Sequence, residues 1–175
     1  MVNKAEHGSV SSISPLILTL GINEAAQHYF DNLRARYFPP KKNFLKAHLT
    51  LFHSLPDEPG IYDYLSKTAE KQPVFSLQAE RIVSIGRGTA IKIESHELMS
   101  LHRALQDYWF GFLSAQDKQK LWAHITIQNK VSPEKAGELQ ALLNTGFESF
   151  RFRASGFRLW RYLGGPWEEL AFFKF

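Results

Sequence analysis

Hydrophobic and polar positions predict a strand and then a helix near the start of the chain. The apolar run over residues 17–23 is typical of a short strand. In the segment 24–38, apolar residues recur at helical spacing, namely Ala25, Ala26, Tyr29, Phe30 and Leu33. Pro39 and Pro40 end this helix, and a basic loop leads to another short strand that begins at His48.

The same order returns in the second half of the chain. Alternation over 89–95 predicts a strand, and the segment 96–110 predicts a helix with one apolar face, formed by Leu98, Leu101, Leu105 and Trp109. A polar loop again leads to a short strand, which begins at His124. We interpret the two halves as copies of one strand, helix, loop and strand unit.

The remaining pattern completes each copy with a helix and antiparallel strands. Helices are predicted over 61–71 and 132–146, and strands over 74–85, 147–163 and 167–175. Glycine-rich turns at 86–88 and 164–166 predict hairpins. The fold class is therefore α+β, with two pseudo-symmetric lobes, each a small antiparallel sheet with flanking helices, around a central cleft. Residues 1–14 are expected to form a flexible tail, and residues 15–175 a single bilobal domain.

Both histidine-headed strands carry the tripeptide H-x-T. Strand alternation puts His48, Thr50 and Phe52 on one face, and His124, Thr126 and Gln128 on the corresponding face of the other strand. The same alternation turns His53 away from the cleft. With seven His and six Thr among 175 residues, chance predicts only about a quarter of one such tripeptide. Two of them, in matching strands, indicate a site built from two halves.

The amino-acid composition excludes several kinds of site but does not identify a reaction. Apolar residues make up 44% of the chain and charged residues 22%, as in folded globular proteins, and the net charge of +4 favours anionic partners mildly. The chain has no cysteine, which excludes disulfides, thiolate catalysis and cysteine metal sites. The polar start lacks the apolar core expected of a signal peptide, and the apolar run 16–20 is too short to span a membrane. We expect a cytoplasmic protein with no membrane partner.

Two imidazoles facing each other suit acid and base catalysis, since the ordinary pKa of histidine lies near neutral pH. Phosphodiester cleavage needs a base for the attacking hydroxyl or water, an acid for the leaving oxygen, and donors for the non-bridging oxygens. Thr50 and Thr126 could supply those donors, because each lies roughly 6 to 7 Å along the strand from its histidine. This scheme requires no metal and no cofactor.

These motifs resemble those of the 2H phosphoesterase superfamily, which includes 2′-5′ RNA ligase-like and cyclic phosphodiesterase proteins. The resemblance covers nearly all the chain after the tail and rests on HLTL (48–51), HITI (124–127), their separation, the preceding strand and helix units, and the closing hairpin 158–175. One departure is Ala123, where many members have proline. The resemblance implies His48 and His124 as catalytic residues, Thr50 and Thr126 as phosphate ligands, and a cyclic nucleotide or RNA-end phosphate as substrate.

Neighbouring residues carry weaker indications. Gln128 and Lys130 could extend the phosphate site, or lie at its rim. Phe52 could stack on a nucleobase, or belong to the core, and one of the aromatic residues of the last hairpin could flank the cleft. The turn at 86–88 is interpreted as a hairpin rather than a phosphate nest, and the histidines of the predicted helices and the tail are not assigned to catalysis.

Three alternatives stay open from the sequence. The chain could join RNA ends as a 2′-5′ RNA ligase, or it could bind RNA or phosphate without turning it over. A metal site on His48 and His124 lacks an evident third ligand, because the two motif strands contain no Asp or Glu. No obligate protein partner is evident, and we expect a monomer.

Overall fold

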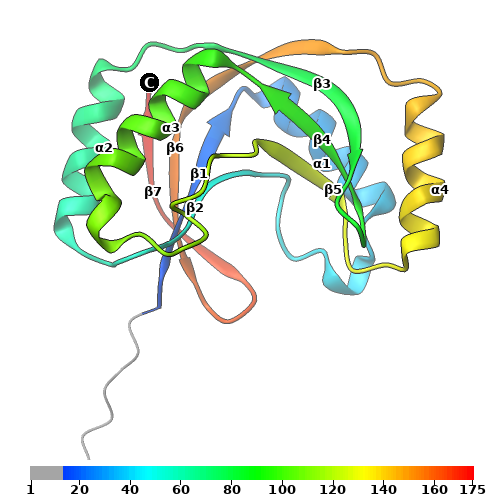
Figure 1. The fold of residues 1–175 in the computed structure, drawn as a ribbon, viewed down its shortest axis with the longest axis horizontal. Helices are drawn as coiled ribbons and strands as arrows, with labels where there is room; N and C mark the ends of the chain where they lie inside the picture. Colours follow the sequence, from blue (N-terminus) through cyan, green and yellow to red (C-terminus); the bar gives the residue numbers. More distant parts are fainter. Residues whose placement is uncertain (1–13) are drawn as a thin grey trace, which may run out of the picture.

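One antiparallel sheet of seven strands runs through the part of the chain that the structure describes, residues 14–175 of a computed structural model (Figure 1). The predicted flexible tail lies outside the described residues except for its last one. Six strands follow one another in the order β2, β1, β6, β3, β4, β5, and β7 pairs with β6 off this path. Their bounds are β1 (Leu16–Ile22), β2 (Leu49–Leu55), β3 (Ser76–Ser84), β4 (Thr89–Glu94), β5 (His124–Gln128), β6 (Phe150–Tyr162) and β7 (Trp167–Lys174).

The long strand β6 joins what the sequence analysis expected to be two separate sheets. Its first four residues, Phe150–Arg153, pair with β3, and from Ala154 onward it pairs with β1. Its later part also pairs with β7. At the change of partners, a Cβ on Gly156 would lie 2.4 Å from the Phe173 carbonyl oxygen, so glycine permits the close approach of β7. The two small sheets expected from the sequence are joined into one curled sheet, because the 13-residue strand β6 pairs with strands of both.

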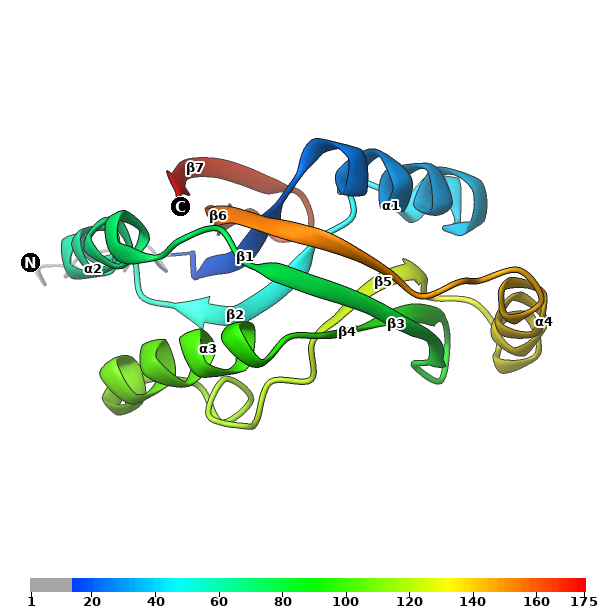
Figure 2. The ribbon, with the colours of Figure 1, turned by 90° about the horizontal axis from the view of Figure 1, so that it is seen from above.

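Four helices flank the curled sheet. They are α1 (Glu24–Tyr37), α2 (Pro59–Lys71), α3 (His96–Trp109) and α4 (Pro133–Asn144), with short 3-10 turns at Pro40–Lys42 and Phe110–Phe112. Figures 1 and 2 show α2 and α3 at one end of the sheet and α1 and α4 at the other. Helix α1, from the first half of the chain, packs near β5 of the second half. The second half of the chain therefore packs its motif strand against a helix of the first half.

The core follows the predicted helix faces with one exception. In α3 the predicted face is confirmed, since Leu98, Leu101, Leu105 and Trp109 are all buried. In α1 the buried residues are Ala26, Phe30 and Arg34, while Tyr29 is 40% exposed. The buried residues of α1 are thus spaced four positions apart, and the last of them is the charged residue Arg34. No helix described within residues 14–175 is long and apolar enough to cross a bilayer.

Candidate active site

The curl of the sheet brings its two edge strands together. β2 and β5 stand at opposite ends of the strand order, yet they are in contact in space. A cavity of about 370 Å³ opens between them, which we call the motif cavity, and His48, Thr50, His124 and Thr126 all line it. Residues separated by more than 70 positions in the sequence therefore share one site.

The two imidazoles are held in the same way. Nδ1 of His48 lies 2.8 Å from the carbonyl oxygen of Lys46, and Nδ1 of His124 lies 2.8 Å from that of Trp122. A carbonyl oxygen can only accept, so in both rings Nδ1 carries the proton of this bond. The lone pair of each neutral ring is then on Nε2, which is the nitrogen left to act on a substrate.

A tryptophan packs against each catalytic candidate. The ring centroid of His48 lies 4.7 Å from that of Trp167 at the start of β7, and that of His124 lies 4.6 Å from that of Trp122. Each imidazole is therefore fixed by one hydrogen bond and one aromatic contact. Trp167 is thus the aromatic residue of the last hairpin that flanks the cleft.

Both histidines are biased toward the neutral form. Burial lowers the pKa of His48 to about 4, the bond to Lys46 opposes this, and the positive charges of Arg34, His124 and His53 lower it further. Burial also lowers the pKa of His124, with the bond to Trp122 opposing and Lys92 adding to the effect. A phosphate bound in the motif cavity would favour the imidazolium form, since a nearby negative charge raises the pKa of histidine.

This electrostatic arrangement predicts acid-sensitive stability. As pH falls, the unfolded chain protonates His48 near its ordinary pKa of 6.5, whereas the folded chain resists until about pH 4. We expect the free energy of unfolding to decline by up to about 3 kcal/mol across this interval on account of His48. Denaturant titrations from pH 7.5 to 4 measure the decline. The variant His48→Gln, which cannot titrate, should show a shallower decline, and equal slopes would contradict the prediction.

A bulge in each motif strand changes which residues reach the cavity. In β2, Leu18 pairs with Phe52 and Thr19 with Thr50, so Leu51 is an extra residue. Alternation is broken there: Phe52 is fully buried, and its ring stacks on that of His102 at 4.7 Å. Of the two alternatives for Phe52, this burial fits the core residue and does not fit stacking on a nucleobase. His53, expected to face away, lines the motif cavity instead.

A matching irregularity removes Gln128 from the site. In β5, Thr89 pairs with Gln128 and Ala90 with Thr126, so Ile127 is the extra residue. Gln128 is 8% exposed and does not line the motif cavity. Lys130 lies past the end of the strand in the left-handed backbone region, with φ at 62°, and is exposed outside the cavity. Of the two alternatives for Gln128 and Lys130, these positions do not fit an extension of the phosphate site within the motif cavity.

Two side chains that the sequence analysis did not assign hold the motif strands from outside. Nη1 of Arg34 donates to the carbonyl oxygen of Thr126 at 2.8 Å, and Nη2 donates to Oδ1 of Asn43 at 3.0 Å. On the other motif, Nε2 of His102 lies 3.1 Å from the carbonyl oxygen of Leu51. Both carbonyls belong to strands at the ends of the strand order, and each accepts this bond from a side chain. Arg34 comes from α1 and His102 from α3, so each motif is supported by the other half.

Asp117, in the loop before the second motif, also forms hydrogen bonds with the strand of the first motif. Both Asp117 carboxylate oxygens accept backbone N–H groups, from His53 at 2.8 Å and Ser54 at 2.9 Å, and Nδ1 of His53 lies 3.1 Å from Oδ1. Burial raises the pKa of Asp117, but these bonds outweigh it and hold the pKa below its ordinary value. No pattern in the sequence marks this loop residue. Within residues 14–175, no three His, Asp or Glu side chains are grouped so as to hold a metal ion.

The comparison with protein families agrees with this geometry. The sequence profile of the 2′-5′ RNA ligase superfamily matches residues 22–166, which include both motifs. The chain belongs to the 2′-5′ RNA ligase superfamily. No curated protein matches it significantly in sequence. Membership in this superfamily supports an enzyme of the phosphoesterase and RNA ligase kind.

Several solved structures share the fold. A phosphoesterase crystal structure matches with a TM-score of 0.60 and 20% identity, over 93% of this chain and 98% of that one. E. coli LigT in complex with 3′-AMP matches with a TM-score of 0.58 and 16% identity, over 92% of this chain and 97% of that one. A protein of Thermus thermophilus gives a TM-score of 0.64 at 16% identity, over 91% and 97%. At such identities the likeness concerns the fold alone.

Proposed function

We propose that the protein is a metal-independent phosphoesterase that hydrolyses cyclic phosphates of nucleotides or RNA ends. The observation that carries the proposal is the matched geometry of His48 and His124, both held through Nδ1 by a carbonyl and both lining one cavity with Thr50 and Thr126. E. coli LigT has been crystallised with 3′-AMP, ATP and NADP+, so a related fold binds nucleotides. In this proposal the two halves are pseudo-symmetric, which the matching tryptophan contacts and bulges support.

The reaction needs two proton transfers, one from the attacking water to a histidine and one from the other histidine to the leaving oxygen. Nε2 of one histidine takes a proton from water, and the water oxygen attacks phosphorus. The bond from phosphorus to one ribose oxygen breaks, and the other histidine gives that oxygen a proton, leaving a phosphomonoester and a free hydroxyl. The Thr50 and Thr126 hydroxyls donate to the non-bridging oxygens, where negative charge develops. Charge and atoms are conserved with either histidine as the base and the other as the acid.

A substrate panel with a chelator tests the proposal. We expect hydrolysis of nucleoside 2′,3′-cyclic phosphates, ADP-ribose cyclic phosphate or RNA with a cyclic phosphate end, at a rate unchanged by EDTA, because two imidazoles supply the acid and the base. A bell-shaped dependence of the rate on pH is expected as well. Loss of activity in EDTA with recovery on adding a divalent metal would contradict metal independence. Salt-dependent binding without turnover of any substrate would identify a phosphate-binding module instead.

The superfamily name also raises ligation of RNA ends. The same site could catalyse ligation if a ribose hydroxyl of a second RNA strand attacked phosphorus in place of water, since the acid and base steps are identical. Including 2′-5′ linked oligonucleotides and pairs of RNA ends in the panel decides between the two directions. The expectations of a monomeric, cytoplasmic protein remain predictions alongside this proposal.

A further inference from the structure

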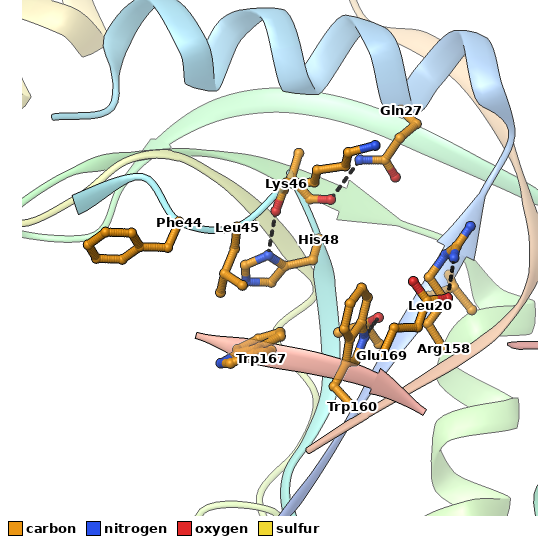
Figure 3. A pocket seen from close by; sticks show the side chains of 12 residues that line it. Leu20, Gln27, Phe44, Leu45, Lys46, His48, Arg158, Trp160, Trp167 and Glu169 are labelled. Atoms are coloured by element: carbon orange, nitrogen blue, oxygen red, sulfur yellow. Dashed lines mark hydrogen bonds and ion pairs between the residues drawn. The ribbon is translucent and has the colours of Figure 1, made fainter. Parts of the chain in front are cut away.

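A second cavity, of about 320 Å³, meets the motif cavity at His48. We call it the Trp160 pocket; it is lined by residues of β1, α1, the loop before β2, and the hairpin β6–β7 (Figure 3). The two cavities have only His48 and Trp167 in common. A ligand whose phosphate occupies the motif cavity can therefore extend past these two rings into the Trp160 pocket.

Aromatic rings give the Trp160 pocket flat apolar surfaces. Phe44 stands at its rim with 68% of its surface exposed, and the ring centroids of Trp160 and Trp167 lie 6.0 Å apart. Trp160 is fixed, because its indole Nε1 donates to Oγ1 of Thr19 at 2.8 Å, and Thr19 is 1% exposed. A held indole beside a cavity is suited to stacking on another flat ring, as in single-stranded nucleic-acid sites.

Polar groups at the pocket suit the edge of a heterocycle better than a phosphate. The Arg158 guanidinium pairs with the Glu169 carboxylate at 2.6 Å, so the two charges cancel there. The Gln27 amide is oriented by its Nε2, which donates to the carbonyl oxygen of Ala47 at 2.8 Å and to Oδ1 of Asp31 at 3.0 Å. Its Oε1 remains an acceptor. The pocket thus offers donors and acceptors with little net charge, apart from Lys46, which is exposed.

We propose that the Trp160 pocket binds the nucleobase of the nucleotide whose phosphate lies between His48 and His124. This inference rests on the proposed function for the identity of the phosphate site. It makes the base a determinant of substrate choice: a cyclic phosphate on a ribose without a base loses the contact with Trp160 and Phe44. Trp167 then serves both cavities, since it packs on His48 and faces the base.

Kinetics with and without a base test the inference. The substrates are adenosine 2′,3′-cyclic phosphate and the methyl riboside 2′,3′-cyclic phosphate, which has no base. Because stacking contributes about 1–3 kcal/mol per base, Trp160→Ala should lower kcat/KM for the nucleotide by about 5- to 150-fold and leave the riboside unchanged. Trp160→Phe should restore most of the loss. Equal effects on both substrates, or no effect on either, would overturn the inference.

Phe44→Ala is a second variant that folding cannot confound, because the ring is largely exposed. It should lower kcat/KM for the nucleotide alone, in the same direction as Trp160→Ala. The matched control is Phe110→Ala, another exposed phenylalanine that lines neither cavity, and it should change neither substrate. An effect of Phe110→Ala equal to that of Phe44→Ala would count against a specific pocket.

Binding separates this inference from the proposed function. The wild-type protein should bind adenosine 3′-phosphate more tightly than ribose 3-phosphate in calorimetry, and Trp160→Ala should remove the difference. If the wild type hydrolyses no cyclic phosphate yet shows this difference, the proposed hydrolysis fails and the base pocket stands. If both ligands bind the wild type equally, the base pocket fails whatever the activity.

Discussion

Alanine in place of His48 or His124 lowers kcat on a nucleoside 2′,3′-cyclic phosphate by about 10²- to 10⁴-fold, the range that a positioned general acid or base contributes. Both imidazoles line the motif cavity with Nε2 left free by the carbonyl bond on Nδ1. When either imidazole is removed, water must replace it as the acid or the base in one of the two proton transfers. Because the two act as a unit, the double variant should be about as slow as the slower single variant, and not slower by the product of both losses.

The control is His28→Ala, an exposed histidine of α1 outside the motif cavity, which should retain wild-type turnover. Steady-state kinetics and thermal melts on the same preparations separate catalysis from folding, since we expect the melting temperature of each single variant to stay close to that of the wild type. Full turnover in both His48→Ala and His124→Ala, on every substrate that the wild type cleaves, would refute the catalytic assignment.

Alanine in place of Gly88 destabilises the whole protein and also damages the second motif. A Cβ at this position would lie 2.0 Å from the carbonyl oxygen of Gln128 and 2.7 Å from Cα of Asn129, so the backbone at the end of β5 must move. Backbone shifts forced by overpacking cost about 1–3 kcal/mol and occasionally more. Because Gln128 is only two residues past Thr126, we expect activity to fall along with the melting temperature.

Gly137→Ala provides a control of the opposite sign. It lies in α4, and a Cβ there meets no atom within 4 Å. Alanine is favoured over glycine in a helix interior by about 1 kcal/mol, so this variant should be more stable than the wild type and equally active. Thermal melts and activity assays of both variants check the pair. A Gly88→Ala protein as stable and active as the wild type would contradict the prediction, because the backbone at the end of β5 would then have moved without loss of stability.

Periodicity predicted the elements well because apolar spacing follows from which face is buried. All four helices and seven strands occur close to the predicted segments, and the apolar face of α3 is buried as expected. The continuous sheet was not predictable in this way. Whether β6 is one strand or two depends on which strands it pairs with, and its alternation reads the same in both cases.

The site shows where strand alternation stops being informative. Strict alternation of strand faces correctly predicted that His48 and Thr50 line the cavity, but it failed beyond the threonine of each motif. An extra residue, Leu51 in one strand and Ile127 in the other, reverses the faces that follow. A bulge depends on how the neighbouring strand pairs, so one strand alone does not disclose it. Asp117 and Arg34 were missed for a related reason, because a buried charged side chain in a loop or helix looks like a surface residue in the sequence.

The bonds from Arg34 to Thr126 and from His102 to Leu51 make the two halves of the chain mutually dependent. Each half carries a complete motif, but the side chain that fixes that motif is encoded in the other. A substitution in α1 can therefore disturb the second motif, and one in α3 the first, although each lies far from the affected strand in the sequence.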